Sequence, residues 1–215
     1  MKPLSQTRLY TFVDTAYLDG RDPVELARML CDSGADLVQL RAKDASEAEV
    51  SRLAGTIGPV CEAAGVWFVL NDHPRIALQT GAPVCHLGQE DFFDGGYTTA
   101  EQVRGCPPEM LLGLSTHAPE QARRALRAGP DYIAIGPVFA TPTKPGRPPV
   151  TLDYVRWASQ NVGIPWFAIG GLDLDNLDAV LAAGARRICV VSAILRASDP
   201  AGACREFARR MAAVG

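Results

Sequence analysis

The sequence has no long apolar run. No segment approaches the roughly 20 apolar residues needed to cross a bilayer, and residues 1–14 lack the continuous apolar core of a signal peptide. The net charge of −3 over 215 residues gives no general attraction to nucleic acid or to an anionic membrane surface. With 47% hydrophobic residues, the chain can bury a core without disulfides. We therefore expect one cytoplasmic domain, residues 1–215, that binds neither nucleic acid nor membrane.

The six cysteines form no CxxC pair and lack the spacing to histidine that structural zinc sites use. Most lie within apolar runs, where a reduced cysteine behaves as a small hydrophobic residue. We expect all six to be buried, reduced thiols: Cys31, Cys61, Cys85, Cys106, Cys189 and Cys204.

The sequence does contain eight short apolar, β-rich runs that each end in polar residues. They are residues 8–14, 36–43, 66–72, 84–91, 111–117, 132–144, 165–171 and 187–194. Segments with helical spacing separate them, most clearly 22–34, 118–129 and 173–184, and less distinctly 74–81 and 95–105. This alternation predicts a parallel (β/α)8 barrel, in which the carboxyl ends of the strands meet at one rim that carries the chemistry.

An open, doubly wound sheet would show the same alternation, but it predicts a glycine-rich turn after the first strand. Here the first run ends in Val13-Asp14-Thr15 without GxGxxG, whereas Gly170-Gly171 follow the seventh. Barrels commonly bind phosphate with the loops after strands 7 and 8, so the late glycines favour the closed barrel.

The first candidate group lies at the end of the second run. Strand alternation places Gln39, Arg41 and Lys43 on one side. A carboxamide can read the edge of a heterocycle, and two cations can hold a polyphosphate. The alternative is that Arg41 and Lys43 are ordinary solvated charges at a strand end.

The second group consists of Asn71-Asp72 after the third run and Asp91 after the fourth. Neighbouring strand ends can share an ion, and Mg²⁺ prefers a few carboxylates completed by water and substrate phosphate. Either aspartate alone is more typical of a helix cap or a turn. His86 is equally consistent with a substrate contact and with a hydrogen-bonded histidine inside the barrel.

The third group is the proline-rich loop after the sixth run, which carries Thr141, Thr143 and Lys144 and could close over a phosphate or simply connect two elements. Ser115 lacks a nucleophile motif and is interpreted as a hydrogen-bond donor, and for the neighbouring His117 a structural role is favoured.

The cations and the acidic pair suit a diphosphate, while the late glycines, Val191-Ser192 and the threonines suit a second phosphate. Two such anion sites indicate a displacement of pyrophosphate, and the sequence shows no redox motif or nucleophilic triad.

Seven motifs in order resemble those of the thiamine phosphate synthases, TIM-barrel transferases that join the pyrimidine and thiazole halves of thiamine phosphate. They are VQLRAK (38–43), LND (70–72), HLGQED (86–91), GLSTH (113–117), GPVFATPTK (136–144), AIGG (168–171) and VVSAI (190–194). The resemblance covers essentially the whole chain.

The resemblance implies roles for individual residues. The pyrimidine diphosphate would be bound by Gln39, Arg41, Lys43, Asn71, His86, Ser115 and Lys144, and the thiazole phosphate by Thr141, Thr143, Gly171, Val191 and Ser192. Mg²⁺ would be the cofactor, held by Asp72 and Asp91. Catalysis would fall to Arg41, Lys43, Ser115 and Lys144, which stabilise charge on the leaving pyrophosphate; losing one such contact typically costs roughly a hundredfold in rate, the expectation for Lys144→Ala.

Two other functions stay open. A related barrel, the thiazole tautomerase, isomerises the thiazole phosphate, but that branch tends to lose the metal-binding aspartate and the TPTK loop that Asp91 and residues 141–144 retain here. A non-catalytic sensor of thiamine precursors is the second alternative, which metal-dependent release of pyrophosphate would distinguish from the enzyme. The sequence leaves both a monomer and a homo-oligomer open.

Overall fold

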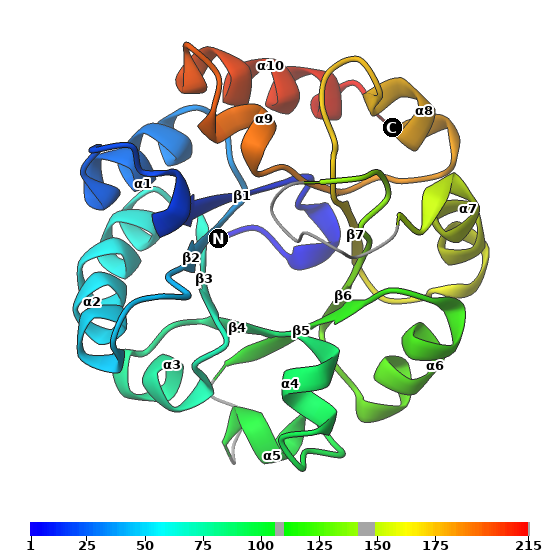
Figure 1. The fold of residues 1–215 in the computed structure, drawn as a ribbon, viewed down its shortest axis with the longest axis horizontal. Coiled ribbons are helices and arrows are strands. Elements are labelled where there is room, and N and C mark those ends of the chain that lie inside the picture. The colour runs from blue at the N-terminus through cyan, green and yellow to red at the C-terminus, as the bar shows by residue number, and fades with distance from the viewer. Residues whose placement is uncertain (106–109, 142–148, 215) are drawn as a thin grey trace.

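Eight parallel strands close into a barrel in chain order, with helices around the outside (Figure 1). The computed structural model describes residues 1–105, 110–141 and 149–214. The strands are β1 (Leu9–Asp14), β2 (Leu37–Arg41), β3 (Trp67–Asn71), β4 (Val84–Leu87), β5 (Leu111–Thr116), β6 (Tyr132–Ile135), β7 (Trp166–Ile169) and β8 (Ile188–Cys189). The pairing of β8 with β1 closes the ring, so the predicted closed barrel is confirmed and the open sheet is wrong.

The helices surround the strands in sequence order. The α-helices are α1 (Pro23–Asp32), α2 (Glu47–Ala63), α3 (Pro74–Thr80), α4 (Gln89–Phe93), α5 (Glu101–Arg104), α6 (Pro119–Ala128), α7 (Thr151–Asn161), α8 (Leu177–Ala182), α9 (Ser192–Leu195) and α10 (Pro200–Ala212). Two short 3-10 helices, η1 (Leu4–Gln6) and η2 (Thr15–Tyr17), flank β1. Among the described residues, no helix is long and apolar enough to cross a membrane.

The helix boundaries follow from local sequence chemistry. The side chain of Asp22 caps α1 by accepting hydrogen bonds from the backbone N–H groups of Val24 and Glu25, and Pro23 occupies the first turn. At the carboxyl end of α6, Gly129 ends the helix in the left-handed conformation, at φ 76°. Both ends agree with the helices predicted from the sequence.

Two strands, β4 and β8, end earlier than the apolar runs from which they were predicted. β8 stops at Cys189, and α9 begins at Ser192 with a hydrogen bond from the Leu195 N–H to the Val191 carbonyl. β4 stops at Leu87, so Asp91 lies in the first turn of α4. An apolar run such as 188–191 has no alternation that would separate the end of a strand from the start of a helix.

The amino-terminal segment covers one end of the barrel and leaves the polar rim at the other. The indole N–H of Trp67, at the start of β3, donates to the Lys2 carbonyl at 2.8 Å. Arg187, just before β8, donates to the Leu4 and Ser5 carbonyls. Figure 1 shows this blue segment crossing the interior of the ring. The carboxyl ends of the strands therefore lie at the opposite end of the barrel, at the polar rim.

The cysteines in the described part of the chain are free and buried, as the sequence predicts: Cys31, Cys61, Cys85, Cys189 and Cys204. Cys106 lies outside the described residues. Burial raises the pKa of the Cys85 and Cys189 thiols, so both stay protonated at neutral pH.

Candidate active site

A cavity of about 580 Å³ opens at the rim, and most of its polar lining residues come from the ends of β2 to β5. Eight residues predicted from the sequence line it: Gln39, Arg41, Lys43, Asn71, Asp72, His86, Asp91 and Ser115. We call it the diphosphate cavity, after the ligand that the sequence predicts for these residues. Lys144, the ninth member of the predicted set, lies outside the described residues.

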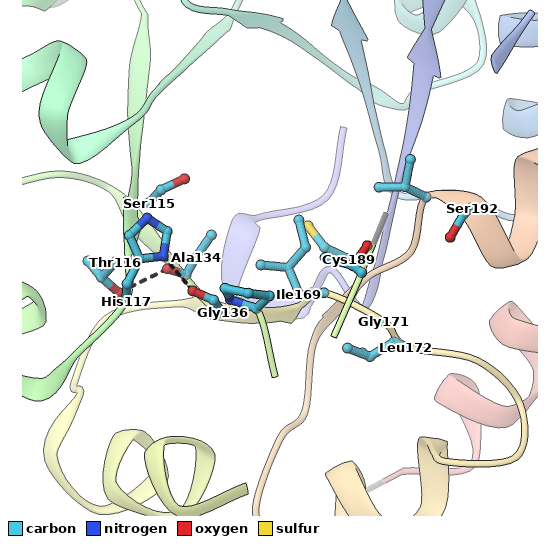
Figure 2. A pocket seen from close by; sticks show the side chains of 14 residues that line it. Ser115, Thr116, His117, Ala134, Gly136, Ile169, Gly171, Leu172, Cys189 and Ser192 are labelled. Atoms are coloured by element: carbon cyan, nitrogen blue, oxygen red, sulfur yellow. Dashed lines mark hydrogen bonds between the residues drawn. The ribbon is translucent and has the colours of Figure 1, made fainter. Parts of the chain in front are cut away.

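A second cavity of about 580 Å³ adjoins the first over β5 to β8, and we call it the glycine cavity. It contains four of the five residues predicted for the second phosphate: Thr141, Gly171, Val191 and Ser192. The fifth, Thr143, lies outside the described residues. Figure 2 shows Ser115 and His117 on one side of this cavity and Gly171 and Ser192 on the other. Ser115 and Val191 line both cavities, so two ligands bound there would be neighbours.

Arg41 is held in place by a buried carboxylate. Its Nη1 lies 2.8 Å from Oδ2 of Asp14, whose side chain is 1% exposed, against 16% for Arg41. The other oxygen of Asp14 accepts from the Ala16 N–H and caps η2. Because the two strands are in register at Asp14 and Arg41, the carboxylate lies directly beside the guanidinium. Within the described part of the chain, Asp14 is the side-chain partner of Arg41, so the remaining N–H groups of the guanidinium can bind an anion.

Asp72 is the meeting point of two neighbouring polar side chains. Its Oδ2 lies 2.8 Å from Lys43 Nζ and accepts a hydrogen bond of 2.6 Å from the Asn71 side chain. The backbone of Asp72 has φ 64°, a left-handed conformation that is uncommon outside glycine. The Asp72 N–H donates to the His86 carbonyl at 2.9 Å, which fixes that turn. Asp72 thus brings the ends of β2, β3 and β4 together.

Asp91 reaches the rim across Gly88. A Cβ atom on Gly88 would lie 2.4 Å from Asp91 Oδ2, so a side chain there would displace this carboxylate from its present position. Asp72 and Asp91 line the diphosphate cavity and also the outer depression beside α3. Within the described ranges, no group of three or more His, Cys, Asp or Glu side chains is placed to hold a metal. A pair of carboxylates suits Mg²⁺, which keeps several waters and takes substrate phosphate oxygens.

The wall of the glycine cavity depends on close backbone packing. A Cβ on Gly171 would lie 2.6 Å from the Ala140 carbonyl oxygen, and one on Gly170 would lie 2.4 Å from Pro137 Cα. Both glycines have positive φ, 103° for Gly170 and 65° for Gly171. The turn after β7 therefore lies directly against the segment after β6, and a side chain at either position would separate them.

The structure also places in the cavities several residues that the sequence reasoning did not assign to the site. Tyr10 and Phe12 line the diphosphate cavity from β1, and His117 lines the glycine cavity. The His117 ring is oriented by a hydrogen bond between Nδ1 and the Gly136 carbonyl, drawn in Figure 2. Strand alternation could have indicated that Tyr10 and Phe12 share a face, but it could not indicate that this face is the inner one.

The comparisons with known proteins agree on one family. The family model for thiamine monophosphate synthase matches residues 9–194. A thiamine-phosphate synthase of Thermus thermophilus is 51% identical over 179 residues, covering 83% of this chain and 84% of that protein. One from Acidothermus cellulolyticus is 45% identical over 212 residues, covering 98% and 97%.

Solved structures share the fold, and one of them carries a related name. The structure of a thiamine phosphate pyrophosphorylase from Pyrococcus furiosus matches with a TM-score of 0.85 and 27% identity, over 98% of both chains. A 3-hexulose-6-phosphate synthase, with a TM-score of 0.63 and 19% identity, shares the fold alone. The chain belongs to the thiamine monophosphate synthase family.

Proposed function

We propose that this chain is a thiamine-phosphate synthase. It joins 4-amino-2-methyl-5-(diphosphooxymethyl)pyrimidine to a thiazole phosphate and releases pyrophosphate, with residues 1–215 acting as one unit. The observation that carries the proposal is the pair of adjoining cavities, one with cations and carboxylates, the other with a glycine turn and hydroxyl groups. Their shared wall at Ser115 and Val191 would place the reacting ends of two substrates side by side.

In the diphosphate cavity, Arg41 and Lys43 would bind the diphosphate together with Ser115 and Lys144. Arg41 is preorganised by Asp14, so little reorientation is needed when negative charge grows on the leaving group. Gln39, Asn71 and His86 line the same cavity and would bind the pyrimidine. In the glycine cavity, the thiazole phosphate would be held by Thr141, Thr143, Gly171, Val191 and Ser192.

Asp72 and Asp91 would hold Mg²⁺. When bound, the ion supplies positive charge that stabilises the oxygens of the departing pyrophosphate. Lys43 already neutralises Asp72 through the 2.8 Å contact. Metal binding at Asp72 would therefore compete with this ion pair and favour a Lys43 ammonium directed at the diphosphate.

The reaction needs little proton transfer from the protein. The bond between the pyrimidine methylene carbon and the diphosphate oxygen breaks, and its electron pair leaves with pyrophosphate. The electron-rich aminopyrimidine stabilises the resulting cation until the thiazole nitrogen donates its lone pair and forms the new C–N bond. The protein's part is to hold both reactants and to keep water from the cation.

The test is incubation with both substrates and Mg²⁺, following thiamine phosphate, pyrophosphate and the isomeric state of the thiazole phosphate in one sample. We expect thiamine phosphate to appear only when both substrates and the metal are present. Isomerisation of the thiazole phosphate without coupling would instead favour a tautomerase. Tight binding of both compounds with no reaction would favour a precursor sensor.

A further inference from the structure

A chain of hydrogen bonds crosses the barrel interior and connects two cavity residues. Gln39 Nε2 donates to the Tyr10 hydroxyl at 2.5 Å, and the Tyr10 and Tyr132 hydroxyls lie 3.2 Å apart. The Tyr132 hydroxyl lies 3.0 Å from His86 Nδ1, and His86 Nε2 lies 2.9 Å from Ser115 Oγ. The chain joins residues of β1, β2, β4, β5 and β6. All five side chains are buried, with exposures of 8% or less.

The chain has a direction, because an amide nitrogen can only donate and each hydroxyl carries one proton. With Gln39 Nε2 as the donor to Tyr10, the Tyr10 proton would be directed to the oxygen of Tyr132. The Tyr132 proton is then directed to His86 Nδ1. A neutral imidazole that accepts at Nδ1 carries its proton on Nε2, where it donates to Ser115 Oγ.

We propose that Tyr10 and Tyr132 are positioning residues that transmit the orientation of the Gln39 amide through His86, so that the Ser115 hydroxyl proton is directed into the cavity as a donor. At the other end of the chain, Gln39 keeps Oε1 as its acceptor. A ligand that fits carries a donor near Gln39 and an acceptor near Ser115. An aminopyrimidine N–H and a diphosphate oxygen have that pattern. The inference therefore rests on the proposed function. It explains how the site would distinguish the two ends of its substrate.

The packing of the barrel interior keeps both phenol rings fixed. Phe167 contacts Tyr10 and Tyr132 edge-on, with ring centroids 5.3 and 5.4 Å away. Gly113 makes room for the second ring, because a Cβ there would lie 2.1 Å from Tyr132 Cζ. Burial raises the pKa of both phenols well above the ordinary value, so both keep the proton that the chain requires.

The opposite direction is the competing arrangement. If Gln39 presented Oε1 to Tyr10, every proton in the chain would reverse, His86 would carry its proton on Nδ1, and Ser115 would donate to His86. Ser115 would then offer only an acceptor to the cavity. The tautomer of His86 therefore reports the direction of the whole chain.

The first experiment is ¹⁵N NMR of the histidine side chains at about pH 8, where an ordinary imidazole is neutral. The protein has three histidines, and His86→Gln identifies the signals of His86 by their loss. We expect the Nε2–H tautomer in the wild type and a shift towards Nδ1–H in Tyr132→Phe. A wild-type Nδ1–H tautomer would overturn the proposal. This readout needs no turnover, so an inactive protein with the Nε2–H tautomer would support the direction of the chain and contradict only the proposed function.

The second experiment compares steady-state kinetics of Tyr10→Phe and Tyr132→Phe with a matched control. Tyr154→Phe also deletes a buried hydroxyl, one that donates to Thr116 at 2.8 Å beside Ser115 but outside the chain. For the two chain variants we expect kcat/KM for the pyrimidine diphosphate to fall roughly tenfold, the effect of one misdirected hydrogen bond, with KM for the thiazole phosphate unchanged. We expect wild-type values for Tyr154→Phe. Equal effects of all three substitutions, or no effect of any, would contradict the proposal.

Discussion

Asp14 and Arg41 form a buried ion pair at the rim, with 2.8 Å between Oδ2 and Nη1. Asp14 lies at the end of β1 and Arg41 at the end of β2, and the two are register partners. The carboxylate lies behind the guanidinium and is 1% exposed, so its part in the site is to orient Arg41 and not to meet a ligand. The residue that orients Arg41 therefore lies outside the seven sequence motifs.

Replacing Asp14 with Asn tests that orientation. Asn keeps a side-chain oxygen that can cap η2 but removes the negative charge that holds Arg41. We expect KM for the pyrimidine diphosphate to rise about tenfold, which corresponds to about 1.4 kcal/mol. Removing one partner of a buried pair can cost about 3–5 kcal/mol, and since Arg41 is 16% exposed we expect the lower end as loss of stability.

Asp153→Asn is the control for this change. Its carboxylate pairs with Arg156 at 2.7 Å, but both side chains are exposed, and such pairs contribute little. Steady-state kinetics and thermal unfolding of both variants make the measurement. If Asp14→Asn behaved like Asp153→Asn, Asp14 would have no part in positioning Arg41.

Asp72→Asn and Asp91→Asn test the proposed metal site. Each removes one of the two carboxylates that line the diphosphate cavity, so we expect the Mg²⁺ concentration for half-maximal activity to rise at least about tenfold. Asp94→Asn is the control, because Asp94 ends the same short helix as Asp91 and is exposed. A Mg²⁺ titration of activity checks all three. An unchanged metal requirement in both cavity variants would place the metal elsewhere.

Gly171→Ala tests the close packing beside the glycine cavity. The added Cβ would lie 2.6 Å from the Ala140 carbonyl oxygen, so the segment after β6 has to move. We expect KM for the thiazole phosphate to rise more than about tenfold, with a smaller change for the pyrimidine diphosphate. Gly81→Ala is matched in backbone strain, at φ 66° against 65°, but its Cβ meets no atom within 4 Å. Equal kinetic effects of the two substitutions would show that the close approach is irrelevant.

The buried phenols predict a loss of stability at high pH. Burial raises the pKa of Tyr10, Tyr132 and Tyr154 above the unfolded value of about 10. A group with a raised folded pKa contributes stability that is complete below its unfolded pKa and is lost as pH rises above it. The Cys85 and Cys189 thiols act in the same way from about pH 8.5.

We therefore expect the melting temperature to fall progressively from about pH 8.5 and more steeply above about pH 10. Ultraviolet absorbance checks this argument, because Tyr10, Tyr132 and Tyr154 should ionise only as the protein unfolds. Ionisation of these three phenols near pH 10 in the folded protein would contradict the burial argument.

The sequence predicted the barrel and the residues that gather at its rim because strand alternation and strand ends are local patterns. Gln39, Arg41 and Asp72 could be identified in this way, and the structure brings them to one cavity. Contacts across the barrel interior have no such local signal. Tyr132 and Tyr10 are 122 positions apart, and no periodicity connects them with Ser115.

The ends of the last strand show a second limit. Residues 188–191 are uniformly apolar, so no local pattern separates the end of the strand from the start of the helix. The three-dimensional structure shows that β8 has two residues and that α9 begins at Ser192. Likewise, the sequence shows Gly88 as part of a motif, whereas its physical reason, the room that it leaves for Asp91, depends on the three-dimensional turn.

The most direct test of the central claim is the stoichiometry of products formed from the pyrimidine diphosphate and the thiazole phosphate. In the presence of Mg²⁺, we expect thiamine phosphate and pyrophosphate to accumulate in equal amounts, formation of both to stop on addition of EDTA, and both to resume when Mg²⁺ is restored in excess. Pyrophosphate release without thiamine phosphate, or no product from the folded protein under these conditions, would contradict the account.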